Sequence, residues 1–391
     1  MESLPLQPFL QSLHKEQWQE ARLGEVAEIN PKETLRKHYL YKKVAMDNLE
    51  PYTKKVYSFG IESFNGGAKF RNGDTLLARI TPCLENGKTA FVDFLQDDEI
   101  AFGSTEFIVL REKATISDKD FLYYLARSKH FREVAIKSMT GSSGRERVQI
   151  EVLRDFTFLL PPLTIQQKIA EILSSFDDKM DLLHRQNKTL ESLALTLFRH
   201  YFIDNPKRDE WEEKPLSEVA YFLNGLACQK LPPRNDKDRL PVLKIKELKE
   251  GISQASDWAT SEIDSQYIVE NGDVIFAWSA SLMVKMWNGS QCVLNQHLFK
   301  VTSQIYPKWF YYFWCKYHLQ DFIAIANAHA TTMGHIKRQD LDLAMCVIPD
   351  TQSLQTIDKE IAPLLQKINI NSKQIQNLQA MRDMLLKAIF A

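Results

Sequence analysis

Two long stretches of the sequence carry apolar residues in a sustained heptad pattern, one after Pro161 and the other after Pro349. Seventeen of the twenty seam positions are apolar, whereas a composition of 44% apolar residues would give about nine. This periodicity predicts two long helices that pack along a continuous seam. The seam positions are Ile169, Leu173, Phe176, Met180, Leu183, Asn187, Leu190, Ala194, Leu197 and Tyr201, then Ile357, Ile361, Leu364, Ile368, Asn371, Ile375, Leu378, Arg382, Leu385 and Ile389.

Each heptad stretch closes one half of a duplicated plan. Residues 23–27 (LGEVA) recur as residues 216–220 (LSEVA), and an Asn-Gly-Asp step at 72–74 recurs at 271–273. In both halves this step leads into an apolar run, then a polar loop, and finally the helix-forming stretch. Because the similarities come in the same order, they indicate an internal repeat.

We expect the two long helices to pair with each other, because five heptads exceed what one small domain can cover. The alternative is that each helix is buried on its own domain. Antiparallel pairing would bring Asn187 and Asn371 to nearly the same level, where a buried amide pair would fix the register. Pro363 removes one helical hydrogen bond, so we expect the second helix to kink or restart there.

The remaining segments mix short β runs with an aromatic helix in each half, near 121–125 and 309–314. This density of rings favours a buried helix over a base-stacking platform. The predicted fold class is α+β, with two pseudo-symmetric mixed α/β domains and two long helices forming an antiparallel coiled coil. The predicted boundaries are 1–162 for the first domain, 163–204 for the first long helix, 205–350 for the second domain and 351–391 for the second long helix.

The composition excludes several classes of protein. A net charge of −1 means that nucleic-acid binding has to rest on local chemistry. The five cysteines form no Cys-x-x-Cys pair, which argues against a zinc ribbon or a disulfide framework. No apolar run approaches the ~20 residues of a membrane span. We therefore expect a cytoplasmic protein with no metal site.

No motif predicts catalysis. Residues 87–89 (GKT) end like a phosphate-binding loop, but the required earlier glycine is Pro82, so a hairpin is expected instead. Residues 236–249 contain two aspartates followed by Glu-Leu-Lys, a nuclease-like pattern that arises often by chance. Cys315 and His318 lack the second ligand pair of a zinc site. We predict no catalytic residues and expect a chain that binds or organises.

Taken together, the sequence resembles the DNA-specificity subunit of type I restriction-modification enzymes from Trp18 to Phe390. The duplication and the order of the motifs carry this resemblance more than any single motif does. The most telling stretches are NGDTLLARI (72–80), GKTA (87–90), GSTEF (103–107), LPPLTIQQKI (160–169) and TTMGHI (331–336).

The resemblance implies a reader of double-stranded DNA that recognises a bipartite site. Each mixed domain would be a target-recognition domain for one half-site, and the coiled coil would set the gap, with half-site centres ~34–36 Å apart on one side of the duplex. It also implies two methyltransferase (modification) subunits that use S-adenosylmethionine, and restriction/translocase subunits that use ATP and Mg. This chain would bind no cofactor and no membrane.

The candidate DNA contacts fall into two chemical groups. Cations suit phosphates, and polar loop side chains suit base edges. The predicted phosphate contacts are Lys54, Lys55, Arg71, Arg79, Lys88, Arg145 and Arg147 in the first domain and Lys244, Lys246, Lys285, Lys337 and Arg338 in the second. The predicted base contacts are Ser104, Thr105, Ser142, Ser143, Asn295, Gln296, His297, Thr331, Thr332 and His335. Each of these residues could equally be a solvated or turn-stabilising loop residue.

A different class of function stays open at this point. The chain could be a non-catalytic coiled-coil adaptor whose mixed domains bind protein partners. Residues 221–350 support this alternative, because their basic and acidic residues balance and a DNA-reading domain usually has a basic face.

Overall fold

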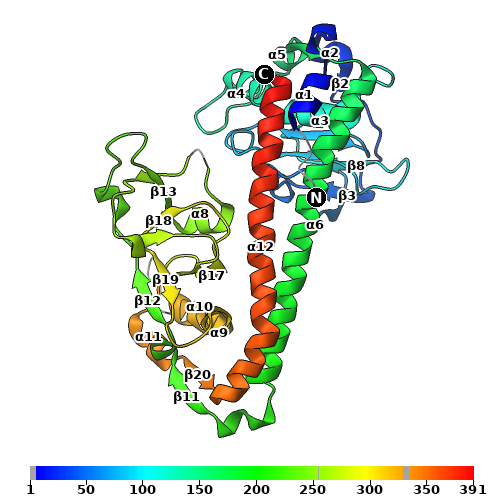
Figure 1. Cartoon of the computed structure of the whole chain (residues 1–391). Coiled ribbons are helices and arrows are strands. Elements are labelled where there is room, and N and C mark those ends of the chain that lie inside the picture. The colour runs from blue at the N-terminus through cyan, green and yellow to red at the C-terminus, as the bar shows by residue number, and fades with distance from the viewer. Residues whose placement is uncertain (1–5, 254, 329–333) are drawn as a thin grey trace. The chain divides into compact units, whose positions relative to one another are not determined.

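The computed structural model describes residues 6–253, 255–328 and 334–391. The chain divides into two compact units, which are described separately. Unit 1 comprises Met1–Asp181 with Leu378–Ala391, and unit 2 comprises Leu182–Asn377. Each unit contains a mixed α/β domain and a portion of both long helices, which are green (α6) and red (α12) in Figure 1.

The long helices α6 (Leu163–Phe202) and α12 (Thr351–Phe390) have 40 residues each. In unit 1, the Arg382 Nη1 atom donates to Asp177 Oδ1 at 2.6 Å. In unit 2, the Asn371 Nδ2 atom donates to Asn187 Oδ1 at 2.9 Å. Also in unit 2, the Tyr201 hydroxyl near the end of α6 donates to Glu360 Oε2 near the start of α12 at 2.9 Å. Each unit therefore has a contact between an earlier part of one helix and a later part of the other, which confirms the predicted antiparallel pairing.

All twenty seam positions are buried or half-buried. The heptad pattern thus marks the face that each helix presents to its partner and to the domain beside it. Of the kink or restart expected at Pro363, the restart was wrong, because α12 continues through this residue. The buried side chains of Ile361 and Leu365 anchor the helix on both sides of the proline, so the loss of one backbone hydrogen bond does not end it.

Unit 1 contains three sheets, with strand orders β1-β10, β2-β9-β6-β7 and β4-β3-β8-β5. All neighbouring strands are antiparallel except β3 and β8. The strands are β1 (Gln19–Arg22), β2 (Ala27–Ile29), β3 (Leu40–Val44), β4 (Gly60–Ser63), β5 (Ala68–Phe70), β6 (Thr75–Ala78), β7 (Thr89–Phe91), β8 (Ala101–Gly103), β9 (Phe107–Glu112) and β10 (Thr157–Leu160). The shorter helices are α1 (Leu6–Ser12), η1 (Lys15–Gln17), α2 (Leu23–Val26), η2 (Met46–Asn48), α3 (Lys119–Arg127), α4 (Lys129–Lys137) and α5 (Ile150–Arg154).

Unit 2 repeats this topology strand for strand, with orders β11-β20, β12-β19-β16-β17 and β14-β13-β18-β15. Its single parallel pair among the described strands, β13 and β18, corresponds to β3 and β8. The strands are β11 (Glu212–Pro215), β12 (Tyr221–Asn224), β13 (Leu240–Leu243), β14 (Trp258–Ala259), β15 (Ile268–Val269), β16 (Val274–Ala277), β17 (Met283–Met286), β18 (Cys292–Leu294), β19 (Leu298–Thr302) and β20 (Met345–Ile348). The shorter helices are η3 (Pro206–Glu210), α7 (Leu216–Val219), η4 (Cys228–Lys230), α8 (Ile245–Glu250), η5 (Ser265–Tyr267), α9 (Lys308–Tyr317), α10 (Leu319–Ala328) and α11 (Arg338–Leu343).

The repeated Asn-Gly-Asp step forms the same turn in both units. Its glycine has φ of 90° in unit 1 and 89° in unit 2, a backbone conformation that favours glycine. The aspartate then anchors the turn to the next strand of the sheet. Asp74 accepts a hydrogen bond from Arg111 Nε at 2.7 Å, and Asp273 lies 2.8 Å from Lys300 Nζ. The repeated motif therefore serves the fold.

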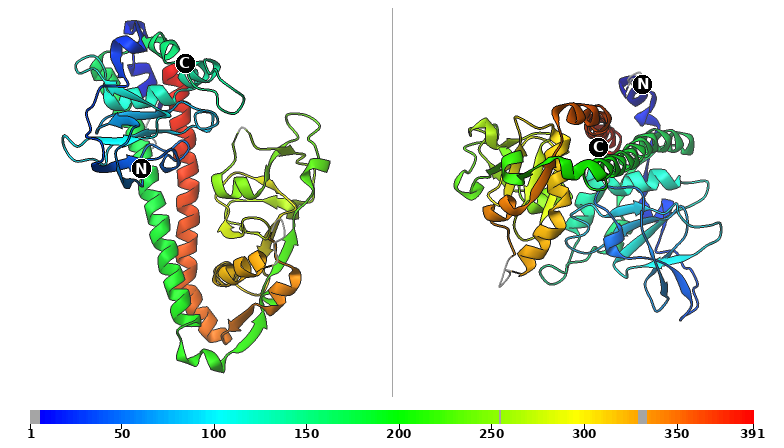
Figure 2. Two further views of the ribbon diagram at one scale, coloured as in Figure 1. Left: turned by 180° about the vertical axis from the view of Figure 1, so that it is seen from behind. Right: turned by 90° about the horizontal axis from the view of Figure 1, so that it is seen from below.

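The aromatic helices α3 and α9 lie between the sheet and the long helices of their own units (Figure 2). The Tyr124 hydroxyl donates to Asp177 on α6 at 2.7 Å, and the Tyr312 hydroxyl donates to Glu191 on α6 at 2.6 Å. The rings of both helices are buried, which confirms that they form core. Among the described helices, none has a stretch apolar and long enough to cross a lipid bilayer.

Candidate nucleic-acid interface

A loop cluster lies at one end of the central sheet of unit 1. Beyond β6 the chain continues into Arg79, whose backbone N–H donates to the Glu106 carbonyl at 2.9 Å. The Arg79 carbonyl accepts from the N–H of Val148 at 2.9 Å, and Ile80 forms an antiparallel bridge with Arg147. These contacts join three separate stretches of the chain. We call Arg79, Glu106 and Arg147 the unit 1 cluster.

The side chains of the unit 1 cluster combine a paired and an unpaired guanidinium. Arg147 donates to the Glu106 carboxylate from Nε at 2.9 Å and from Nη2 at 2.7 Å. The hydrogen bonds from Arg147, helped by the charge of Arg79, lower the pKa of Glu106. Among the described residues, the Nε atom of Arg79 has no hydrogen-bond partner. This Nε atom is buried, so the cluster combines the half-buried guanidinium of Arg79 with the ion pair between Arg147 and Glu106.

Unit 2 has a loop cluster built on the same backbone. The N–H of Trp278 donates to the His297 carbonyl at 3.4 Å, and the Trp278 carbonyl accepts from the N–H of Ile336 at 3.1 Å. Ser279 forms an antiparallel bridge with His335. We call Trp278, His297 and His335 the unit 2 cluster. Position by position, its residues correspond to Arg79, Glu106 and Arg147 of unit 1.

The unit 2 cluster is aromatic and carries no guanidinium at its centre. Trp278 stacks on Phe299 with a centroid distance of 5.6 Å, and its indole N–H donates to Asn224 Oδ1 at 3.2 Å. The rings of His297 and His335 lie 6.0 and 6.4 Å from the indole. Both imidazoles are exposed, and the indole beside them is half-buried.

The loop that precedes β19 positions the polar residues of this surface. His297 Nδ1 lies 3.3 Å from the Ser279 hydroxyl, and its Nε2 lies 3.4 Å from Gln296 Nε2. Asn295 is buried, and its Oδ1 accepts from the His297 backbone at 3.3 Å. The structure therefore places Gln296 and His297 at the surface, whereas Asn295 shapes the loop.

Several predicted phosphate contacts have their ammonium groups bound by other residues of the protein. Burial also lowers the pKa of Lys285. Lys54 is 10% exposed and forms an ion pair with Asp120, so the structure gives it a role in holding unit 1 together. The partners are Asp120 and Ser174 for Lys54, Asp178 and Asp181 for Lys55, Met46 for Lys88, Asp257 for Lys244, and Leu248 for Lys285.

Other predicted contacts are accessible. Ser104 is half-buried, and its hydroxyl accepts from the Glu106 N–H at 3.1 Å, as a turn-stabilising residue does. Two predicted base contacts, Thr331 and Thr332, lie outside the described residues. The exposed predicted residues are Arg71, Thr105, Ser142, Ser143, Arg145, Lys246, Lys337 and Arg338.

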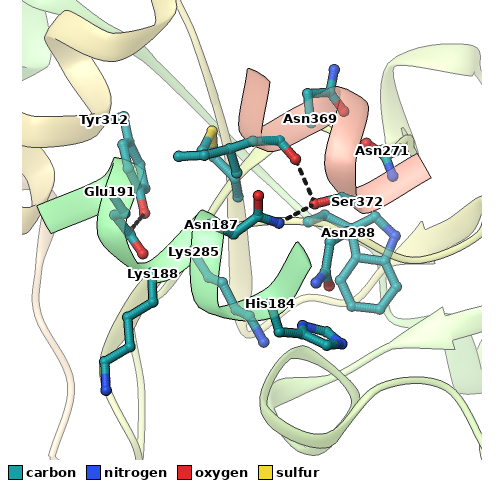
Figure 3. A pocket seen from close by; sticks show the side chains of 14 residues that line it. His184, Asn187, Lys188, Glu191, Asn271, Lys285, Asn288, Tyr312, Asn369 and Ser372 are labelled. Carbon is teal, nitrogen blue, oxygen red and sulfur yellow. Dashed lines mark hydrogen bonds between the residues drawn. The ribbon is translucent and has the colours of Figure 1, made fainter. Parts of the chain in front are cut away.

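A polar cavity of about 230 Å³ lies in unit 2 between the second domain and the long helices (Figure 3). Asn187 and Ser372 from α6 and α12 are hydrogen-bonded at 3.4 Å on its wall, and Tyr312 binds Glu191 on another wall. Neither amide atom of Asn271 has a partner among the described residues. These contacts join the domain to the helices and form no nucleophile–base pair.

The nuclease-like stretch of the sequence is not assembled into a catalytic site. Asp238 accepts from the hydroxyls of Thr260 and Ser261, which lower the pKa of its carboxylate to about 2. Glu247 is buried and accepts from Ser256 at 3.1 Å. In the part of the chain that the structure describes, no three His, Cys, Asp or Glu side chains are grouped to hold a metal ion.

Sequence reasoning missed Trp278, Glu106 and Asn224 as parts of this interface. A detectable signal was present, because the residue directly after the strand that follows each Asn-Gly-Asp turn is Arg79 in one half and Trp278 in the other. The contact between Trp278 and Asn224 spans 54 residues, so it required the fold.

Comparison with known proteins matches both halves of the chain. The family model described as the type I restriction modification DNA specificity domain matches residues 15–192 and again residues 208–380. The MjaIX specificity subunit of Methanocaldococcus jannaschii is 27% identical over 296 residues, which cover 69% of this chain and 68% of that protein. The HindI specificity subunit of Haemophilus influenzae is 31% identical over 147 residues, covering 37% of this chain and 31% of that protein.

A solved structure supports the fold. The type I restriction-modification S subunit from M. genitalium aligns with a TM-score of 0.56 at 14% identity, covering 96% of both chains. The family match covers nearly the whole sequence and repeats at the boundary between the duplicated halves. The chain therefore belongs to the family of the type I restriction modification DNA specificity domain.

Proposed function

We propose that this chain is the DNA-recognition subunit of a type I restriction-modification complex and reads a bipartite site, one half-site with each unit. The observation that carries this proposal is the correspondence between the unit 1 cluster and the unit 2 cluster. Two units with the same strand order and the same loop contacts present different side chains at corresponding positions. A duplicated scaffold with divergent surface residues suits the reading of two different short sequences.

The chain acts without catalysing a reaction itself, as the specificity-subunit names of its relatives indicate. We propose two methyltransferase subunits as partners, each carrying S-adenosylmethionine, and restriction/translocase subunits that use ATP and Mg. The complex works in the cytoplasm. The paired helices α6 and α12 act as the spacer between half-sites, and their unbroken length supports this role.

The test is to assemble the chain with its methyltransferase subunits in a host that lacks other modification systems, and to sequence the methylated genomic positions. We expect a single motif with two defined parts separated by a gap of fixed length and indifferent sequence. A complex of the methyltransferase subunits without this chain is the control. If the full complex modifies no enriched sequence, the proposal fails, and the protein-binding adaptor becomes the better account.

A further inference from the structure

The two loop clusters share a backbone register that assigns corresponding residues without reference to their side chains. Ala78 pairs with Phe107 in unit 1, and Ala277 pairs with Leu298 in unit 2. The next residue along β6 or β16 is Arg79 or Trp278, and each is held by the same two backbone hydrogen bonds. These residues therefore occupy one position of the repeated scaffold.

In the unit 1 cluster, Arg79 is the arginine whose side chain does not bind the Glu106 carboxylate. Glu106 is already bound by Arg147 through Nε and Nη2, and among the described residues its carboxylate forms no hydrogen bond or ion pair with Arg79. The Nε atom of Arg79 is buried and has no partner among the described residues, so a contact to a base falls to the two terminal nitrogens of this half-buried side chain. A guanidinium carries five donors in a plane and matches the paired O6 and N7 acceptors of guanine.

Trp278 brings different chemistry to the same position. Its only polar group, the indole N–H, is already bound to Asn224, and its ring is stacked on Phe299. It therefore cannot bind two acceptors of one base. Among the described residues, the polar groups around it include the amide of Gln296 and two imidazoles, none of which has the paired cationic donors of arginine.

We propose that Arg79 and Trp278 are corresponding specificity-determining residues, and that Arg79 reads a guanine in the half-site of unit 1. Trp278 makes the half-site of unit 2 indifferent to guanine at the corresponding base pair. The two half-sites then differ in sequence because one scaffold position differs in side chain. This inference rests on the proposed function, since it assumes that each unit reads one half-site.

The test uses the assembled complex with single substitutions and the methylation readout described above. Arg79→Trp should weaken discrimination for guanine by about 10- to 100-fold at one base pair of one half-site, leaving the other half-site unchanged. Trp278→Arg should introduce a guanine preference into the other half-site. Arg79→Gln serves as a second variant if Arg79→Trp does not fold, because glutamine prefers adenine and should shift the same base pair.

The matched control is Arg145→Ala, which removes an exposed cation of the same domain outside the cluster. It should weaken methylation of every site without changing the motif. If the wild type shows a split motif but the Arg79 and Trp278 variants leave both half-sites unchanged, this inference is overturned while the proposed function stands. If the wild type shows no split motif, the proposed function itself fails.

Discussion

At the scale of single residues, Asp177 and Arg382 form a buried ion pair where α6 and α12 meet in unit 1. Burial opposes the charge of Arg382, but Asp177 and Asp383 outweigh this effect and raise its pKa. The positions 188 residues away in the repeat, Leu365 and Ala194, are apolar and buried in unit 2. At these corresponding positions, unit 1 therefore has a buried ion pair and unit 2 has apolar side chains.

Replacing Arg382 with methionine should lower the free energy of unfolding by about 3–5 kcal/mol, because Asp177 would remain buried with the Tyr124 hydroxyl as its one remaining partner among the described residues. The double variant Asp177→Leu with Arg382→Met should recover most of this loss, since an apolar pair of similar volume avoids the buried charge. Urea titration followed by circular dichroism measures both. Arg199→Met, on the exposed face of α6, is the control and should change little. A loss below ~1 kcal/mol for Arg382→Met would contradict the argument.

Glu191 makes the stability of unit 2 depend on pH. Burial raises the pKa of this carboxyl, but the charge and hydrogen bond of Lys316, 2.6 Å away, together with the hydrogen bond of Tyr312, lower the pKa by more, so the net shift is downward. A folded-state pKa below the unfolded value of about 4.3 stabilises the fold fully above that pH and loses its effect as pH falls below it. The melting temperature of the wild type should therefore exceed that of Glu191→Gln at pH 7. This difference in melting temperature should be smaller at pH 3.5. Glu171→Gln replaces an exposed carboxylate and is the control, because its difference in melting temperature from the wild type should not become smaller at pH 3.5.

At the scale of the elements, the long helices combine an apolar seam with one polar layer in unit 2. Asn371 is fully buried, donates to Asn187, and keeps an Oδ1 atom without a partner among the described residues. A buried acceptor of this kind costs about 1–3 kcal/mol. In coiled coils, a polar seam residue specifies register at a cost in stability. The layer therefore favours a unique pairing over maximal stability.

Replacing both Asn187 and Asn371 with leucine should raise the midpoint of chemical unfolding but allow shifted or intermolecular helix pairing, because leucine fits any register of an apolar seam. Sedimentation velocity would then reveal dimers or larger species alongside the monomer. Gln379→Leu adds an apolar side chain at an exposed position of α12 and is the control for nonspecific hydrophobic association. An unchanged distribution of species in the double variant would show that the amide layer does not set the pairing.

At the scale of the whole molecule, the net charge of −1 leaves DNA affinity to a small set of accessible cations. Accessibility separates the predicted phosphate contacts into two groups. Arg145 is exposed, whereas the Lys54 ammonium lies in a packed ion pair with Asp120 at 2.5 Å. Only an exposed cation such as Arg145 can contact a phosphate and release counterions when DNA binds.

Arg145→Ala should therefore reduce the slope of log affinity against log salt by about one unit, without altering the preferred sequence. Lys54→Ala should leave this slope unchanged and lower thermal stability instead. Titration of the assembled complex with a duplex carrying its motif, over about 50–200 mM salt, measures the slopes. Equal slopes for Arg145→Ala and the wild type would remove Arg145 from the DNA contacts.

Much of the fold was predictable because its determinants are local in the sequence. The heptad spacing predicted two paired helices, since the repeat places every seam residue on one face of a helix. The two Asn-Gly-Asp steps predicted matching turns, because a glycine with positive φ and a following aspartate specify them within a few residues. The continuity of α12 through Pro363 was not predictable from the sequence, since burial of Ile361 and Leu365 in the tertiary core outweighs one missing hydrogen bond.

The sequence by itself determined the duplication, the antiparallel helix pair and the family, because these follow from periodicity and from the order of motifs along the chain. Only the tertiary structure decided which polar residues remain available for DNA. The Lys54 ammonium group is bound by Asp120, 66 residues away, and Glu106 is bound by Arg147, 41 residues away, so the half-buried Arg79 side chain stays outside that ion pair. The accessibility of a charged group depends on neighbours from distant parts of the chain, and folding alone brings them together.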